Sequence, residues 1–337
     1  MKEASFYEKQ PEKHVHCYLC RQHCGIAPGK RGLCGVRENR DGTLYSLIYE
    51  YPCATHVDPI EKKPLFHFLP GSKAFSIATA GCNFHCRHCQ NSDISQISDK
   101  GCALGGERVS AGEVVNYALQ TGCRSISYTY TEPTIFYEYA FDIARLAAEK
   151  GLYNNFVTNG YIEDAPLEQI RPYLHGANID LKGFNENFYG RVCKAKLSGV
   201  LDTIRSYKRL NIWIELTTLI IPGYNDNMEE LKKLAQFIRE ELGPQVPWHV
   251  SGFYPTYKLT DAPPTSSATL KAVREIGLEE GLKYVYEGNV AGSEGEHTYC
   301  YNCTKPIIKR LGFTITEYNI KNSACVFCNA TIDGIGL

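Results

Sequence analysis

The sequence lacks the features that would place a protein in a membrane, in a secretory pathway or on a nucleic acid. No apolar run of about 18 residues occurs in the chain, which excludes a transmembrane helix of ordinary length. The first residues, Met1 to His14, are polar and contain no apolar core of a signal peptide. The formal net charge is only −1, so a surface that binds polyanions is not expected. The composition predicts an ordinary globular protein of the cytoplasm, without a membrane or nucleic-acid partner.

Cysteine, in contrast, is abundant, with 15 residues in a chain of 337. Because no signal peptide points to an oxidising compartment, metal binding explains these cysteines better than disulfides do. Most of them fall into three groups, at positions 17–34, 82–89 and 300–328, which random use in a protein core would not produce. The others, Cys53, Cys102, Cys123 and Cys193, are scattered, and we expect them to be packing residues.

The middle group follows a short apolar stretch, 75–79, that is typical of a buried strand. Cys82, Cys86 and Cys89 stand after it in a C-x3-C-x2-C pattern. Three thiolates this close can bind three irons of a 4Fe–4S cluster and leave the fourth iron open to a substrate or cosubstrate. The same residues could also belong to a structural zinc site or be buried thiols. The strand before them and the motifs after them favour the cluster.

Two flanking groups each offer four thiols, enough to close the coordination of a metal. The N-terminal group consists of Cys17, Cys20, Cys24 and Cys34. It suits zinc and an auxiliary iron–sulfur cluster equally well. The C-terminal group consists of Cys300, Cys303, Cys325 and Cys328. Paired C-x2-C motifs of this kind are usual in zinc ribbons and rubredoxin-like iron sites, and a structural zinc is favoured here. The two ends of the chain could also meet and share ligands.

From about residue 73 to 290, short apolar runs alternate with amphipathic helical patterns. We expect strands at 75–79, 125–130, 155–158, 177–181, 213–221, 249–254 and 283–287. We expect helices at 112–120, 135–150, 167–173, 197–210, 228–242 and 265–281. This alternation predicts parallel βαβ units, hence an α/β fold with an open, partial TIM-type barrel of about six or seven units. The expected division is a cysteine-rich segment and connector at 1–70, the barrel at 71–292, and a zinc-ribbon- or rubredoxin-like segment at 293–337.

Polar residues that suit a ligand stand on or just after four of these strands. They are Thr131 and Glu132, Thr158 and Asn159, Asp180 and Lys182, and His249. Asp180 and Lys182 share one face of a strand, and burying both charges is costly unless they pair or meet a ligand. Glu215 and Thr217 also share a face directed inward. The alternatives are structural: a helix N-terminus, an ordinary turn, an ion pair and a satisfied core histidine, respectively.

The loop from Ala80 to Asn91 resembles the cluster loop of the radical S-adenosylmethionine (SAM) enzymes. The resemblance implies that the amino and carboxylate groups of SAM bind the open iron. It implies that His88, at a position that is usually aromatic, touches the adenine, and that the segment of Thr131 and Glu132 holds the methionine amino group. Tyr130 and Thr131 replace two glycines of that segment. Thr158 and Asn159 are expected at the ribose or the methionine carboxylate.

Further segments resemble related enzymes. Asp180 and Lys182 match an Asp-Leu-Lys segment of the pyruvate formate-lyase activating enzymes that lies beside the cosubstrate, and His249 matches a histidine of the same enzymes. Nearly the whole chain resembles the radical SAM enzyme of the AmmeMemoRadiSam system. The matching parts are 17–37, 58–71, 80–91, 128–134, 221–226 and the terminal cysteine pairs. This resemblance implies a 4Fe–4S cluster and SAM as cofactors, an external one-electron donor of the flavodoxin or ferredoxin type, anaerobic chemistry, and Memo-like and AMMECR-like partners.

Three functions are compatible with these motifs. The first is an oxidoreductase that cleaves SAM to a 5′-deoxyadenosyl radical and takes hydrogen from an unidentified substrate. The second is an activase that makes a glycyl radical on a partner protein; the flanking cysteine groups argue mildly against it, because a minimal activase needs only the cluster loop. The third is a zinc-ribbon binding module without catalysis, which the neutral charge disfavours. The first function is the one we expect.

Overall fold

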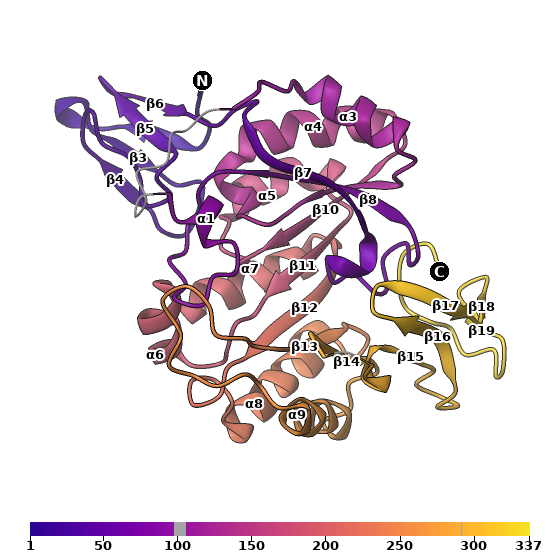
Figure 1. Cartoon of the computed structure of the whole chain (residues 1–337). Helices are drawn as coiled ribbons and strands as arrows, with labels where there is room; N and C mark the ends of the chain where they lie inside the picture. Colours follow the sequence, from indigo (N-terminus) through magenta and orange to yellow (C-terminus); the bar gives the residue numbers. More distant parts are fainter. Residues whose placement is uncertain (98–105, 291) are drawn as a thin grey trace.

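An eight-stranded sheet forms the centre of the structure (Figure 1). The computed structural model describes residues 1–97, 106–290 and 292–337, so Cys102 lies outside the described residues. The strands follow one another in the order β14-β13-β12-β11-β10-β9-β8-β7. Neighbours from β8 to β14 are parallel, and β7 joins β8 antiparallel at one edge. Within the described chain, β7 and β14 do not pair with each other, and the prediction of an open, partial barrel is confirmed.

The parallel strands of this sheet are mostly buried, because parallel sheets are covered on both faces, whereas the antiparallel edge strand β7 is largely exposed. The strands of the whole sheet are β7 (Pro52–Pro59), β8 (Lys73–Thr79), β9 (Ser125–Tyr128), β10 (Tyr153–Thr158), β11 (Gly176–Asp180), β12 (Trp213–Ile220), β13 (Trp248–Gly252) and β14 (Val285–Gly288). Every predicted strand is present, with small differences at the ends. The strand predicted at 125–130 ends earlier, because β9 stops at Tyr128 and Tyr130, with a φ of 64°, leaves the extended conformation.

Helices connect the parallel strands and pack against the sheet (Figure 1). The main helices are α3 (Ala111–Gln120), α4 (Tyr137–Glu149), α5 (Asp164–Ile170), α7 (Leu197–Arg209), α8 (Met228–Phe237) and α9 (Ser267–Glu279). Two short helices, α1 (Ser92–Ser95) and α6 (Glu186–Phe188), were not predicted. The predicted helix 228–242 divides into α8 and a π-helical turn, Ile238–Leu242. None of the helices in the described parts of the chain has the length and apolar character that a bilayer crossing requires.

The N-terminal segment forms two three-stranded sheets, β2-β3-β4 and β1-β6-β5. Their strands are β1 (Lys2–Glu3), β2 (Tyr7–Lys9), β3 (Val15–Cys17), β4 (Cys24–Ile26), β5 (Arg37–Arg40) and β6 (Thr43–Ser46). A buried ion pair attaches this segment to α4: Arg37 Nη2 lies 3.0 Å from Glu138 Oε1. The backbone N–H of Ser5 donates to the same carboxylate at 2.7 Å. The segment is therefore fixed to the barrel by a charge pair that has little access to water.

The C-terminal segment covers the gap between the two edges of the open sheet. Its strands are β15 (Thr298–Tyr299), β16 (Pro306–Leu311), β17 (Thr314–Tyr318), β18 (Ile320–Lys321) and β19 (Ala324–Cys325). Arg310 Nη2 donates to the carbonyl of Phe66, in the connection after β7, at 3.1 Å. On the other edge, the Tyr286 hydroxyl of β14 lies 3.0 Å from Thr298 Oγ1. This segment thus closes the side of the barrel that the sheet leaves open.

The two cysteine-rich ends do not share ligands. Figure 1 shows the N-terminal sheets and the C-terminal sheets on different sides of the barrel. The four C-terminal cysteines form a complete group by themselves, with sulfur atoms that all lie within 4.8 Å of one another. The possibility that both ends meet at one metal site is therefore wrong.

Removing one partner of the Arg37–Glu138 pair leaves a buried, uncompensated charge. We expect Glu138→Ala to lower the free energy of unfolding by about 3–5 kcal/mol, measured by chemical denaturation. Glu149→Ala is the matched control, because Glu149 lies on the same helix in an exposed pair with Arg145 and should change stability by less than about 1 kcal/mol. Equal effects of the two substitutions would contradict this role of the buried pair.

His67 attaches the C-terminal tail and is buried in its neutral form. Its Nδ1–H donates to the carbonyl of Asp333 at 2.6 Å, and Nε2 lies 2.6 Å from the Tyr286 hydroxyl. Burial lowers the pKa of His67 to about 4. As the pH falls below about 6.5, His67 binds a proton in the unfolded chain but stays neutral in the folded chain. The free energy of unfolding should therefore fall by about 3 kcal/mol between pH 6.5 and 4.

The test is the difference in unfolding free energy between His67→Gln and the natural chain across this pH range. We expect the variant to lack the His67 contribution and therefore to depend less steeply on pH. His56→Gln, at an exposed histidine, should leave the pH dependence unchanged. A His67→Gln profile parallel to that of the natural chain would contradict the assignment.

Candidate active site

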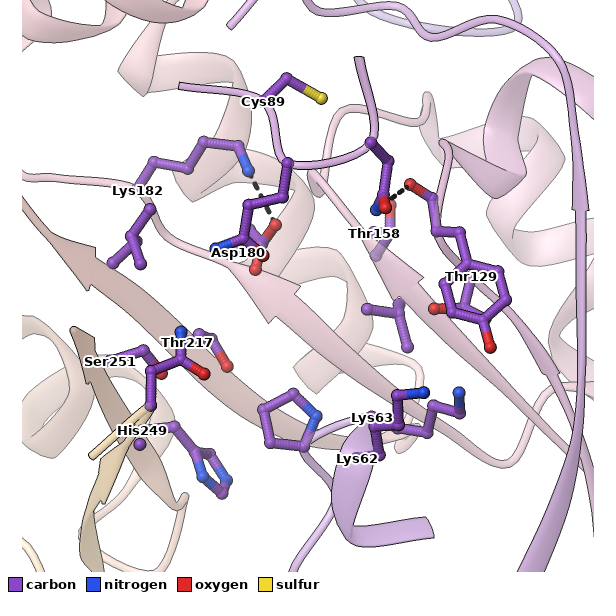
Figure 2. Close-up of a pocket in the computed structure, with 18 of the residues that line it drawn as sticks. Lys62, Lys63, Cys89, Thr129, Thr158, Asp180, Lys182, Thr217, His249 and Ser251 are labelled. Carbon is purple, nitrogen blue, oxygen red and sulfur yellow. Dashed lines mark hydrogen bonds and ion pairs between the residues drawn. The ribbon is translucent and has the colours of Figure 1, made fainter. Parts of the chain in front are cut away.

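A cavity of about 740 Å³ lies at the C-terminal ends of the parallel strands, where partial and complete barrels place their chemistry. Its volume is within the range of about 300–1,000 Å³ that small-molecule sites occupy. The residues that the sequence predicted for the barrel site all line it. They are Cys82, Cys86, His88, Cys89, Thr131, Glu132, Thr158, Asn159, Asp180, Lys182 and His249. Figure 2 shows several of them around one space, from Cys89 on the cluster loop to His249 on β13.

The loop after β8 brings three thiols to one end of this cavity. Cys82 and Cys86 are buried and Cys89 is partly exposed. Cys82 Sγ accepts from the backbone N–H of Phe84 at 3.4 Å and from Asn159 Nδ2 at 3.3 Å. Cys89 Sγ lies 3.1 Å from Ser95 Oγ on α1. These donors favour the thiolate form. The contact with Cys193 raises the pKa of Cys86, and burial raises the pKa of Cys82 and Cys89. The protein alone therefore keeps these thiols protonated, and a metal would have to displace the protons.

The backbone of the loop is held from both sides. The N–H of Gly81 donates to the carbonyl of Ile94 at 2.8 Å. The N–H groups of His85 and Arg87 donate to the carbonyls of Cys193 and Val192 at 3.1 and 3.0 Å. These bonds fix the loop to α1 and to the turn before α7, so the three cysteines keep their relative positions.

Glu132 joins the ends of β9 and β10. Its carboxylate accepts from the N–H and hydroxyl of Thr134 at 3.0 and 2.6 Å, from Thr158 Oγ1 at 2.8 Å and from the N–H of Asn159 at 2.8 Å. Burial raises the pKa of Glu132, although these donors oppose the shift. Glu132 therefore positions Thr158 and Asn159, and through Asn159 it supports Cys82.

Tyr130 stands where the resembled segment carries a glycine, and it adopts a φ of 64°. Non-glycine residues rarely enter this left-handed region, because their Cβ atom meets the following carbonyl. The Tyr130 hydroxyl donates to the carboxylate of Asp58. Asn91 Nδ2 donates to the backbone carbonyl of Tyr130 at 2.8 Å. These bonds hold the turn in the conformation that glycine would adopt freely.

Asp180 and Lys182 form an ion pair at the end of β11, drawn as a dashed line in Figure 2. Lys182 Nζ lies 2.7 Å from Asp180 Oδ2. Burial opposes the charge of Lys182, but Asp180, Cys86 and Cys193 together outweigh it and hold the pKa of Lys182 well above its usual value. The pair and the cavity are both present, so the structural and the ligand-binding interpretations of these residues are compatible.

His249 lines the cavity but is already bound to Glu215, with Nε2 at 2.8 Å from Oε2. Glu215 also accepts from the N–H groups of Phe66 and His67 at 2.9 and 2.8 Å. Burial would raise the pKa of Glu215, but its bond to His249 lowers it below the usual value. Glu215 is thus a buried anion that organises the connection after β7, and it leaves the second nitrogen of His249 available.

His88 is buried, and its Nδ1 has no hydrogen-bond partner among the described residues. Its ring lies parallel to that of Phe188, with 6.4 Å between the centroids. Burial, together with the charge of Lys182, lowers the pKa of His88 to about 3. The ring is therefore neutral near pH 7 and suits stacking.

Comparisons with known proteins agree with this geometry. Residues 76–238 match the family model of the Radical SAM superfamily. Over 335 residues the chain is 47% identical to the uncharacterized protein MJ0808 of Methanocaldococcus jannaschii, and the match covers 99% of each chain. The chain belongs to the radical SAM superfamily. Because this superfamily is a class of enzymes, the prediction of an enzyme is confirmed, and the binding module without catalysis is excluded.

Other radical SAM proteins are more distant. The chain is 26% identical to the putative glycyl-radical enzyme activating enzyme MJ1632 of the same organism, over 62% of this chain and 78% of the relative. It is 21% identical to the pyruvate formate-lyase-activating enzyme of Staphylococcus aureus, over 60% and 87%. A radical SAM methyltransferase of Sphaerobacter thermophilus shares the fold, with a TM-score of 0.50, 15% identity and coverage of 69% of this chain and 70% of that chain.

The three thiols fit the 4Fe–4S cluster that this superfamily implies better than they fit a single ion. A tetrahedral zinc site holds its sulfur atoms about 3.8 Å apart. In the described residues, Cys82, Cys86 and Cys89 do not form a group whose ligand atoms all lie within 4.8 Å. A cluster binds each cysteine through a different iron, so it accommodates wider spacing.

Sequence reasoning missed several residues that line the cavity or lie beside it. Lys62 and Lys63 line the cavity away from Cys89 (Figure 2), and both bind Asp58, at 2.9 and 2.6 Å. Burial lowers the pKa of Lys63 to about 8. The Glu-Lys-Lys-Pro motif of residues 61–64 was the available signal. Cys193, predicted to be a packing residue, is buried beside the thiol of Cys86, and no spacing in the sequence indicates this contact.

The C-terminal cysteines have the geometry of a site for one metal ion. The sulfur atoms of Cys300 and Cys328 lie 3.6 Å apart, and those of Cys303 and Cys325 lie 3.8 Å apart. These distances match the value of about 3.8 Å that tetrahedral coordination by four sulfurs requires. The group lies outside the cavity, at the segment that closes the open side of the radical SAM barrel.

The role of Glu132 can be tested by stability. We expect Glu132→Gln to lower the free energy of unfolding by about 1–3 kcal/mol. Both carboxylate oxygens of Glu132 accept hydrogen bonds, and the amide NH2 of glutamine would place a donor against one set of these donors. Glu168→Gln, at an exposed helical position, is the control and should have little effect. An unchanged stability of Glu132→Gln would contradict this role of the carboxylate.

Proposed function

We propose that the protein cleaves SAM reductively and uses the resulting 5′-deoxyadenosyl radical to take hydrogen from a substrate in the large cavity. The observation that carries this proposal is the convergence of Cys82, Cys86 and Cys89 on one end of a cavity of about 740 Å³ at the C-terminal ends of the strands. When bound there, a 4Fe–4S cluster with an open iron supplies the electron for this cleavage.

The chain's own residues bind and orient SAM in this proposal. Thr131 and Glu132 lie at the end of β9, where the methionine amino group is expected. Thr158 and Asn159 follow β10, on the side of the ribose or the methionine carboxylate. The neutral ring of His88 suits the adenine. These assignments draw on the residues' place around the cavity and on the resemblance of their motifs.

The Asp180–Lys182 pair and His249 complete the polar side of the site. Asp180 is the more exposed partner of its pair, with 35% of its side-chain surface accessible, so it is the partner that can accept from a ribose hydroxyl. His249 is held by Glu215 through one nitrogen and keeps the other for a ligand. Both groups are fixed before a ligand arrives, which lowers the cost of ordering them on binding.

The wall around the cavity favours a small or flexible substrate. Glu296, Gly312 and Phe313 of the C-terminal segment line the cavity together with Lys62 and Lys63. They occupy the side that the open sheet leaves uncovered, and they limit the access of water to a reactive radical. A small molecule, or a group presented by a partner protein, fits this enclosure better than a large folded surface does.

A second candidate function is activation of a partner protein by a glycyl radical. The similarity to activating enzymes over about three fifths of the chain favours it. In either function we propose an external one-electron donor of the flavodoxin or ferredoxin type, a cytoplasmic location with anaerobic chemistry, and a structural zinc at the C-terminal cysteines. From the resemblance to the AmmeMemoRadiSam system we also propose Memo-like and AMMECR-like partners.

The test is anaerobic reconstitution with iron and sulfide, reduction with dithionite, and measurement of 5′-deoxyadenosine formed from SAM. We expect the natural chain to form it, and a variant with Cys82→Ala, Cys86→Ala and Cys89→Ala to form none. Cys53→Ala is the matched control, because Cys53 is exposed and belongs to none of the three groups, and it should keep full activity.

Equal formation of 5′-deoxyadenosine by the triple variant would overturn the assignment of the cluster loop. To separate the two candidate functions, the natural chain is incubated with a glycyl-radical enzyme encoded nearby and examined by electron paramagnetic resonance (EPR). A protein-based glycyl radical would favour the activase.

A further inference from the structure

The four N-terminal cysteines surround a second, smaller cavity beside the cluster loop. Cys17 ends β3, Cys20 follows in the turn, Cys24 begins β4, and Cys34 comes from the loop before β5. All four line this cavity, together with Arg37 and Asn83. Its other walls are apolar, with Leu19, Ile26 and Ile135 among them. Four thiols around one enclosed space indicate a bound group rather than four packing residues.

The spacing of these thiols does not suit one metal ion. The C-terminal cysteines of the same chain show what such a site looks like here, with sulfur atoms that all lie within 4.8 Å of one another. In the described residues, no three ligand atoms of the N-terminal group meet that limit, although all four cysteines line one cavity. The N-terminal group shares this wider spacing with Cys82, Cys86 and Cys89.

Two buried donors at this cavity have no acceptor. Within the described chain, Arg37 Nε and Asn83 Nδ2 are buried and without a hydrogen-bond partner. Arg37 is 2% exposed and Asn83 is 1% exposed, and both residues line the cavity. Buried donors are nearly always satisfied in folded proteins, so each one needs an explanation. The sulfides of an iron–sulfur cluster are acceptors in addition to the cysteine sulfurs, and hydrogen bonds to the sulfurs of such clusters are a usual feature. A zinc site would offer these donors only its cysteine thiolates.

We propose that Cys17, Cys20, Cys24 and Cys34 bind a second iron–sulfur cluster of the 4Fe–4S type, with one cysteine on each iron. This cluster is coordinatively closed, unlike the one at Cys82, Cys86 and Cys89. The C-terminal cysteines bind a single ion. The proposal resolves the choice between zinc and a cluster that the sequence leaves open at the N-terminal group, and it does not depend on the reaction proposed for the large cavity.

The position of this second cluster site connects it to the first. A Cβ atom on Gly81 would lie 2.8 Å from the carbonyl oxygen of Cys34, so the two ligand-bearing segments touch. Gln22 Nε2 donates to the carbonyl of Asn83 at 2.8 Å. Asn83 follows Cys82 directly and lines the second cavity. The two groups of cysteines are therefore joined through Asn83, the residue after Cys82.

The test measures iron, acid-labile sulfide and zinc in the full chain after anaerobic reconstitution. The decisive sample is the variant with Cys82→Ala, Cys86→Ala and Cys89→Ala, which leaves the N-terminal group untouched. We expect this variant to keep about four irons and four sulfides per chain, together with one ion at the C-terminal site. Adding Cys20→Ala should remove the remaining sulfide, while adding Cys53→Ala instead should not.

The ion at the C-terminal site reports whether each variant is folded, because that site lies apart from the substitutions. A folded triple variant that holds no sulfide and binds zinc at two sites would overturn the proposal. So would sulfide that survives the addition of Cys20→Ala. If Cys82, Cys86 and Cys89 bind no cluster, the result would be different: the natural chain and the triple variant would contain equal amounts of iron.

Discussion

The loop that carries Cys82, Cys86 and Cys89 depends on a close contact that leaves no room for a side chain at Gly81. This residue has a φ of 100°, a conformation that L side chains rarely adopt, and a Cβ atom there would lie 2.8 Å from the carbonyl of Cys34. The contact sets the distance between the N-terminal segment and the barrel. The buried Arg37–Glu138 pair holds the same two parts together from a second point. The contact at Gly81 and the Arg37–Glu138 pair therefore fix the positions of the large cavity and of the smaller cavity lined by the N-terminal cysteines.

Specific contacts also fix the C-terminal segment to the barrel, on a different side from the N-terminal segment (Figure 1). An open sheet leaves two edges apart, and the C-terminal segment spans them through Arg310, Thr298 and the tail that His67 holds. Four cysteines with the spacing of a single-ion site lie in this small segment. The segment also packs a small apolar core against Phe66, Tyr284 and Tyr286 of the barrel. Lys182 is paired with Asp180, and His249 is bound to Glu215, before any ligand arrives. The protein thus combines a rigid site with a wall that carries four cysteines in the spacing of a single-ion site, and both features suit chemistry that must exclude water.

The sequence allowed the parallel strands and the cavity residues to be predicted, because apolar periodicity and motif spacing are local properties. It did not reveal that β7 joins the sheet or that Tyr130 leaves the extended conformation, since both depend on tertiary contacts with Asp58 and β8. The role of Glu215 was also out of reach, because its partners Phe66 and His67 are far away in the sequence. The difference between the two flanking cysteine groups lies in distances between sulfur atoms, and these became visible only when the chain was folded.

The central claim is that SAM binds at the open iron of a cluster held by Cys82, Cys86 and Cys89. The most direct measurement is the EPR spectrum of the anaerobically reconstituted, reduced protein before and after SAM is added. The account predicts that SAM changes the spectrum of the natural chain, and that it changes nothing in the variant that lacks these three cysteines. A spectrum that SAM leaves unaltered, in protein shown to hold the cluster, would contradict the account.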